Sequence, residues 1–163
     1  MALCIAIDAP ELVRKLVLGS TTSASDKIAK EGSDRWIALA RSKDRSALTA
    51  ELIDCLYSEK MIGQYKELLL HMNDNMTDND IDRFIIQTQA IDGFDVYDEL
   101  HQISCPALVI GAEGDKVLPP EHSRRIAEKL GCELHLYGAE YGHCVYDEAS
   151  DYQQRILDFF HKG

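Results

Sequence analysis

The segment ALVIGAEGDKVLPPE, residues 107–121, decides the fold class of this chain. It begins with a short apolar run at residues 107–110, which follows Pro106 and is typical of a buried strand. A loop with two glycines and Asp115 comes next, and Pro119 and Pro120 then open a helix, because proline is favoured in the first turn. Strand, loop and helix in this order predict a parallel sheet that is covered by helices.

A second unit of the same kind follows directly. Gly131 is expected to end the helix, and residues 132–137 predict the next short strand. The segment YGAEYGHC, residues 137–144, leaves that strand and carries His143. A last helix has its expected buried stripe at Tyr152, Ile156, Phe159 and Phe160. Residues 93–163 therefore predict an α/β unit.

Asp115 and His143 are polar residues whose positions suggest a shared chemistry. Each follows the carboxyl end of a predicted strand, and open α/β sheets place their ligand chemistry at that edge. An aspartate that accepts a hydrogen bond from a histidine Nδ1 fixes the tautomer, so the other ring nitrogen can act as a general base. The pair therefore matches the acid and the base of a nucleophilic triad, with the acid first in the chain.

The N-terminal stretch, residues 1–20, reads as a helix followed by a strand. Residues 1–9 are compatible with a helix that Pro10 ends. The apolar run at residues 12–18 predicts a strand, with Gly19 and Ser20 at its exit. With the two later strands, it gives a short parallel sheet of about three strands.

Residues 21–92 predict four amphipathic helices and no strand. Apolar residues recur at helical spacing in the first three, and Thr77 can cap the fourth. The expected stripe of the third helix consists of Met61, Tyr65, Leu68, Leu69 and Met72. These helices form a layer that must pack against another part of the protein.

The whole chain resembles the C-terminal part of an α/β-hydrolase. The resemblance rests on the strand, the GAEGD loop (residues 111–115), the helix, the strand, the Gly-His loop and the last helix, in that order. In addition, IAIDAPELVRKLVLGS, residues 5–20, is similar to the end of the family's nucleophile-bearing helix and the strand after it. The resemblance implies a partial α/β-hydrolase fold, with residues 1–20 and 93–163 in the core and residues 21–92 as the inserted cap. By position, Asp115 would be the triad acid and His143 the triad base.

The chain departs from the family in one large respect. The nucleophile elbow G-x-S-x-G occurs nowhere in the 163 residues, and the oxyanion-hole amides are missing with it. We therefore expect a truncated hydrolase for an ester, lactone or similar acyl substrate, inactive as this chain alone. Two alternatives are a non-catalytic module that self-associates through the open edge of the first strand, and one half of a two-chain hydrolase. No cofactor is implied, because a nucleophile and an oxyanion hole suffice.

Other residues could replace the missing nucleophile only with difficulty. Cys144 adjoins His143, but neighbouring loop residues point apart. Ser20, Ser23 and Ser25 follow the first strand on the correct edge of the sheet, where the family has the entrance to its cap. None of them is expected to serve as the nucleophile.

Two metal-site patterns also fail. Asp78, Asp80 and Asp82 mimic the start of a calcium loop, but Arg83 and Gln89 stand where an EF-hand needs glycine and glutamate. The acids are better explained as the polar first turn of a helix. The histidines at 71, 101, 122, 135 and 161 have no metal-ligand spacing.

The composition narrows the partners. Seventeen basic and 28 acidic residues give a net charge of −11, which disfavours nucleic acids and anionic membrane surfaces. Five cysteines without a C-x-x-C pair favour reduced thiols and the cytoplasm. Under the cap, the resemblance implies a pocket for a small apolar or aromatic-derived acyl substrate, and Trp36, Met61, Tyr65 and Met72 are candidates for its lining.

Overall fold

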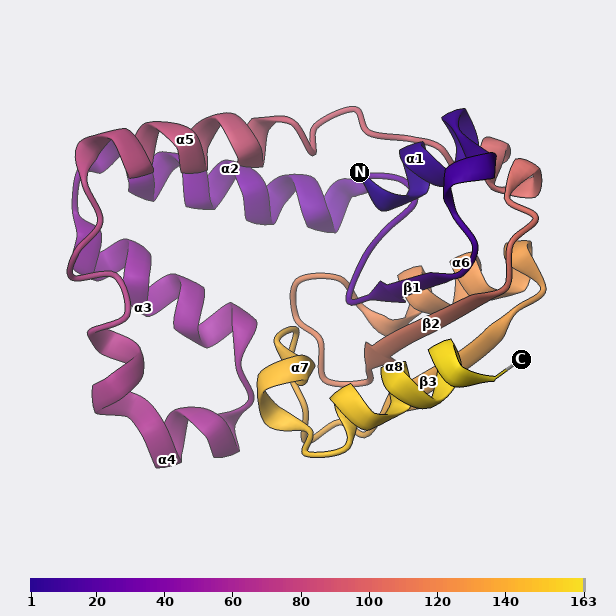
Figure 1. The fold of residues 1–163 in the computed structure, drawn as a ribbon. Coiled ribbons are helices and arrows are strands. Elements are labelled where there is room, and N and C mark those ends of the chain that lie inside the picture. The colour runs from indigo at the N-terminus through magenta and orange to yellow at the C-terminus, as the bar shows by residue number, and fades with distance from the viewer. Residues whose placement is uncertain (163) are drawn as a thin grey trace.

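Three short parallel strands lie side by side in the order β1 (Leu16–Gly19), β2 (Ala107–Ala112) and β3 (Glu133–Tyr137) (Figure 1). They are seen in a computed structural model that describes residues 1–162. Leu18 is paired with Val109, and Ile110 with His135, both in parallel register. The predicted short parallel sheet of about three strands is confirmed.

Helices cover both faces of the sheet, and β2 shows why. All six of its residues are buried, and they alternate between the two faces as the pleat requires. Ala107 and Val109 pack against α1 (Ala2–Asp8), the 3-10 turn η2 (Asp98–Gln102) and α6 (Pro120–Leu130). Leu108 and Ile110 pack against α7 (Val145–Glu148) and α8 (Tyr152–His161). A central parallel strand needs this double cover, which explains its continuous apolar run.

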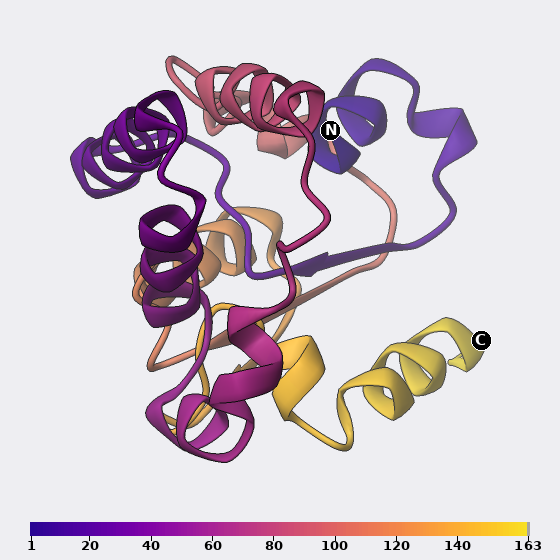
Figure 2. The same ribbon diagram turned by 90° about the vertical axis from the view of Figure 1, so that its left-hand side faces the viewer.

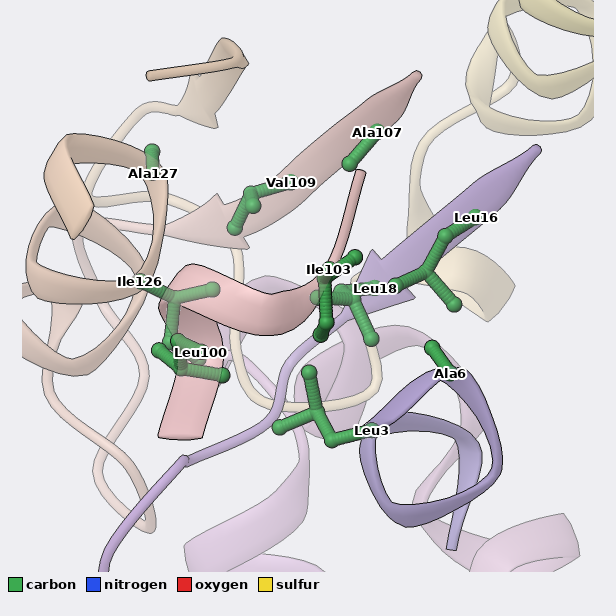
Figure 3. Packing of buried hydrophobic residues seen from close by; sticks show 10 residues of the cluster. All are labelled: Leu3, Ala6, Leu16, Leu18, Leu100, Ile103, Ala107, Val109, Ile126 and Ala127. Carbon is green, nitrogen blue, oxygen red and sulfur yellow. The ribbon is translucent and has the colours of Figure 1, made fainter. Parts of the chain in front are cut away.

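The core on the α1 side is drawn in Figure 3. There Leu3 and Ala6 of α1 project toward Leu18 of β1, while Leu100 and Ile126 meet beside them. Leu100 and Ile126 have no exposed surface at all. The N-terminal helix is therefore an integral part of the core.

The middle of the chain forms α2 (Lys27–Ser42), α3 (Arg45–Leu56), α4 (Glu59–Leu70) and α5 (Asp78–Gln89). Figures 1 and 2 show α2 and α5 side by side, with α3 and α4 extending down one side of the molecule. Each helix starts at a polar cap residue, in chain order Asp26, Asp44, Ser58 and Thr77. Thr77 and Asp80 form a reciprocal capping box, so the acids near residue 78 do belong to a helix start.

The two connections of this helical layer to the rest of the chain run antiparallel to each other. The Ser25 N–H donates to the Phe94 carbonyl at 2.7 Å, and the Val96 N–H donates to the Ser23 carbonyl at 2.8 Å. Beside them, the buried His122 of α6 contacts Asp26 through Nε2 at 3.1 Å. The chain thus enters and leaves the helical layer through two segments that are hydrogen-bonded to each other. The limits at residues 20 and 92 stay predictions.

The strands differ from the sequence prediction at their ends. The run at residues 12–18 was expected to be one strand, but the 3-10 turn η1 (Pro10–Leu12) takes its start, and β1 begins only at Leu16. The ladder begins there because Leu16 is paired with Ala107, the first residue after Pro106. At the other end, β2 continues through Gly111 to Ala112, beyond the predicted limit of residue 110.

Two helical stripes were also partly wrong. Helix α4 leaves helical geometry at Tyr65 and ends at Leu70, so Leu68 and Met72 face solvent instead of continuing the predicted stripe. In α8, Phe159 is buried but Phe160 is half exposed. Adjacent helical residues point about 100° apart, so one narrow interface buries only one of them.

Gly111 gives a test of the packing between α6 and the sheet. A Cβ at this position would lie 2.5 Å from Ser123 Oγ and 3.1 Å from Leu136 Cδ2. We expect Gly111→Ala to lower the free energy of unfolding by about 1–3 kcal/mol, because overpacking displaces its neighbours. Urea denaturation measures this change.

The matched control is Gly63→Ala in α4, where a Cβ would meet nothing within 4 Å. It should raise the free energy of unfolding by about 0.5–1 kcal/mol, since alanine loses less backbone entropy in a helix. Equal stabilities for the two variants would contradict the packing described here.

Candidate active site

Asp115 lies in the loop after β2, and both oxygens of its carboxylate accept hydrogen bonds. Oδ1 accepts the backbone N–H groups of Val117 at 2.9 Å and Leu118 at 2.8 Å. The side chain is only 1% exposed. A buried carboxylate needs such partners, so the DKVL sequence supplies both the acid and the amides that hold it.

His143 completes the pair from the loop after β3. Its Nδ1 lies 2.8 Å from Asp115 Oδ2, and its side chain is 19% exposed. A carboxylate oxygen only accepts hydrogen bonds, so Nδ1 carries the hydrogen and the neutral ring has its lone pair on Nε2. The two residues that the sequence singled out are thus brought together. Their catalytic role stays a prediction.

The backbone around His143 is held by polar contacts from two other segments. The hydroxyl of Ser20 donates to the His143 carbonyl at 2.7 Å, and the Cys144 N–H donates to the Leu56 carbonyl at 2.8 Å. Ser20 is held at φ +42°, in the left-handed region. The Ser20 hydroxyl therefore supports the main chain of the His143 loop, and within residues 1–162 it forms no hydrogen bond with the imidazole.

Within residues 1–162, the other candidate nucleophiles form no hydrogen bond with the ring either. Cys144 is buried against Ile53 and Tyr57 of the cap, and burial raises the pKa of its thiol. A protonated, buried thiol is a poor nucleophile. Ser23 is buried in the connection to α2, and Ser25 lines a separate small cavity between α2 and α5.

A cavity of about 850 Å³ opens beside His143, between the core loops and the cap. Its walls are largely apolar: Ile28, Trp36, Leu56, Ile91, Phe94, Val117 and Leu118. Of the four residues suggested from the sequence, only Trp36 lies here. Met61 and Tyr65 line a different cavity of about 210 Å³, and Met72 lines neither of them. Helix α4 is kinked at Tyr65.

The basic side chains Arg35 and Lys116, which line the large cavity, are paired with acids outside it. Arg35 lies 2.5 Å from Glu51, and Lys116 lies 3.6 Å from Asp54 while also donating to the Asp54 carbonyl at 3.0 Å. These pairs offset the cationic charge at the rim. The cavity therefore has largely apolar walls that also include polar side chains such as Glu31 and Gln87, and the ring of His143 is part of its lining.

Within residues 1–162, no group of three or more His, Cys, Asp or Glu side chains is arranged to hold a metal ion. In the same part of the chain, no helix is long and apolar enough to cross a bilayer.

Solved structures identify the fold. The chain superimposes on MGS-M2, an α/β hydrolase enzyme from a Medee basin deep-sea metagenome library, with a TM-score of 0.90 and 25% identity over 99% of this chain. This α/β-hydrolase fold is the one that the sequence predicted. The chain is an α/β-hydrolase-fold protein. It also superimposes on the enol-lactonase from Burkholderia xenovorans LB400, with a TM-score of 0.82 and 19% identity over 98% of this chain.

Sequence relatives point the same way. A Rhizobium rhizogenes protein that carries the name carbamate hydrolase RutD is 28% identical over 170 residues, or 98% of this chain, and a Caulobacter protein of the same name is 29% identical over 132 residues. No protein-family model matches the chain. The chain spans 62% and 48% of those relatives and 61% and 60% of the two solved structures.

Some site residues were not found from the sequence. The sequence assigns no role to Val117 and Leu118, although their backbone N–H groups hold the Asp115 carboxylate. Lys116 and Glu148, which tie the two loops to the cap, carry no pattern that marks them. Such contacts depend on how the cap sits over the sheet.

Asp115 allows its two oxygens to be tested separately. Asp115→Ala leaves two buried N–H groups without an acceptor and should cost about 1–3 kcal/mol in the free energy of unfolding. Asp115→Asn keeps an acceptor oxygen and should stay within about 1 kcal/mol of the parent protein. Urea denaturation of both variants measures these changes. Equal losses of unfolding free energy would show that the Val117 and Leu118 amides do not depend on Oδ1.

Proposed function

We propose that this chain supplies the acid, the base and the cap of a hydrolase that acts on small, largely apolar acyl compounds. The single observation that carries the proposal is the Asp115–His143 pair at the edge of an apolar cavity. A buried carboxylate on Nδ1 leaves Nε2 free to accept a proton, which is what acyl transfer requires of its base.

The proposed reaction uses a serine from a G-x-S-x-G elbow, a motif that these 163 residues do not contain. His143 Nε2 takes the serine proton as the serine oxygen attacks the acyl carbon. Asp115 stabilises the imidazolium ion, which then protonates the leaving alcohol or amine. Water repeats the cycle, with His143 taking its proton, and releases the acid and the free serine.

The edge strand β1 supports the idea that another strand-bearing segment completes the sheet. The N–H groups of Leu16 and Ser20 donate to the carbonyls of Pro106 and Ile110, so those of Val17 and Gly19 point to the opposite side. Within residues 1–162, β1 pairs with no strand there. Such an edge invites pairing with an elbow-bearing segment or with a second copy of this chain, and we propose self-association for the chain by itself.

The substrate class follows from the cavity walls. Trp36 and Phe94 offer aromatic surface, and Leu118 and Val117 bring apolar surface next to Asp115. The rim cations are already paired with acids. An uncharged ester, lactone or similar acyl compound with an aliphatic or aromatic body therefore fits better than an anionic one. No cofactor is needed for this chemistry.

The five cysteines favour a reducing compartment for this chain, and we propose the cytoplasm. Across the described residues each of them is a free thiol. Burial raises the pKa of Cys55, Cys132 and Cys144, which suits unreactive structural thiols.

The activity can be tested by complementation. The chain is refolded with an α/β-hydrolase segment chosen because it carries a G-x-S-x-G elbow, and hydrolysis of p-nitrophenyl butyrate is followed. We expect turnover that a serine reagent blocks and that His143→Ala lowers by about a thousandfold or more, because triad members act as a unit.

The isolated chain is the control and should show no turnover above its own His143→Ala variant. A stable one-to-one complex without turnover would contradict the proposed function. Turnover by the isolated chain that a serine reagent blocks would contradict the need for a second segment.

Binding of the substrate class can be measured through the single tryptophan, Trp36. Methyl benzoate should change its fluorescence with a saturable profile, since the aromatic ester would bind in the cavity that Trp36 lines. Ile28→Asp places a carboxylate in the cavity wall and should weaken binding by about tenfold.

Ile86→Asp is the matched control, because Ile86 is an exposed isoleucine on α5 that does not line this cavity. It should leave binding unchanged. Equal weakening by both variants would show that the ester binds elsewhere.

A further inference from the structure

Glu148 of α7 bridges the cap and the loop that carries His143. Its Oε1 accepts the Ser58 N–H at 3.0 Å and the Gly142 N–H at 3.2 Å. Its Oε2 accepts the hydroxyl of Ser58. One carboxylate therefore joins the start of α4 to the residue directly before His143.

The two segments that Glu148 joins are in direct backbone contact. A Cβ on Gly142 would lie 2.8 Å from the Leu56 carbonyl oxygen and 2.9 Å from the Ser58 nitrogen. Only glycine allows this approach. Together with the Cys144 N–H bond to the Leu56 carbonyl, it presses the loop against residues 56–58, the turn between α3 and α4.

These contacts fix the backbone of His143 from both sides. The peptide before His143 is held through the Gly142 N–H, and the peptide after it through the Cys144 N–H. Asp115 then fixes only the rotation of the ring. The same turn also lines the substrate cavity through Leu56, so a ligand under the cap contacts the segment that holds the base.

We propose that Glu148 is a positioning residue that couples the turn at residues 56–58 of the cap to the base His143. The proposal rests on the proposed function of His143. A carboxylate suits the task because one oxygen can accept two N–H groups in charge-assisted hydrogen bonds. Glu148 does not touch the reacting atoms and acts only through the loop.

The experiment measures amide hydrogen exchange at Gly142 in the full chain by NMR. Glu148→Ala should accelerate exchange at Gly142 by about tenfold, because its N–H loses its acceptor. Glu148→Gln should restore slow exchange, since the amide oxygen can still accept both N–H groups. Glu148→Asp has a side chain shorter by one methylene and should lose protection at Gly142. If Glu148→Ala fails to fold, the Gln and Asp variants carry the comparison.

Two controls separate positioning from general stability. Ser58→Ala removes the N-cap of α4, whose Oγ accepts the Met61 N–H at 3.2 Å, so it should lower the melting temperature. It should nevertheless keep Gly142 protected. Glu140→Ala removes an exposed acid of the same loop and should change neither value.

Unchanged exchange at Gly142 in the Ala and Asp variants would overturn the proposal. Equal acceleration in Ser58→Ala would also overturn it, because Glu148 would then serve stability alone. None of these readouts uses hydrolysis. A failed complementation would therefore count against the proposed function, but it would not change the result of the exchange measurement at Gly142.

Discussion

The hydrogen bond between Asp115 Oδ2 and His143 Nδ1 is the interaction on which this structure's chemistry depends. It joins the loops after β2 and β3, and it exists because parallel strands bring their carboxyl ends to one edge. The second carboxylate oxygen is already bound to two backbone amides, so the acid cannot turn away. Burial raises the cost of leaving any of these groups unpaired, which makes the arrangement rigid.

The cap is bonded to the segments around this pair. Lys116 reaches Asp54 from the acid's loop, and Glu148 reaches Ser58 from beyond the base's loop. The end of α3 and the start of α4 are thereby tied to these parts of the core, and the cavity lies between the core loops and the cap. The cavity and the Asp115–His143 pair are thus held by the same few contacts. In the proposed reaction, the apolar walls select the substrate and the two loops carry the groups that act on it.

The sequence predicted those parts of the fold whose cause is local. The apolar run of β2, the proline start and glycine end of α6 and the Thr77 cap each follow from the properties of a few neighbouring residues. The pairing of Asp115 with His143 followed from strand order. The late start of β1, the kink at Tyr65 and the cavity lining did not, because each depends on what packs opposite. Ladder pairing begins only where β2 lies opposite β1, and no spacing in the sequence places Glu148 beside Gly142.

The state of the His143 ring is the most direct test of the account. In protein labelled with ¹⁵N-histidine, a His143→Ala variant assigns the signals of this residue. The account predicts that the neutral ring carries its hydrogen on Nδ1 and that Nε2 keeps its lone pair, with this preference lost in Asp115→Ala. A neutral ring with its hydrogen on Nε2, or a tautomer ratio that Asp115→Ala leaves unchanged, would contradict the account.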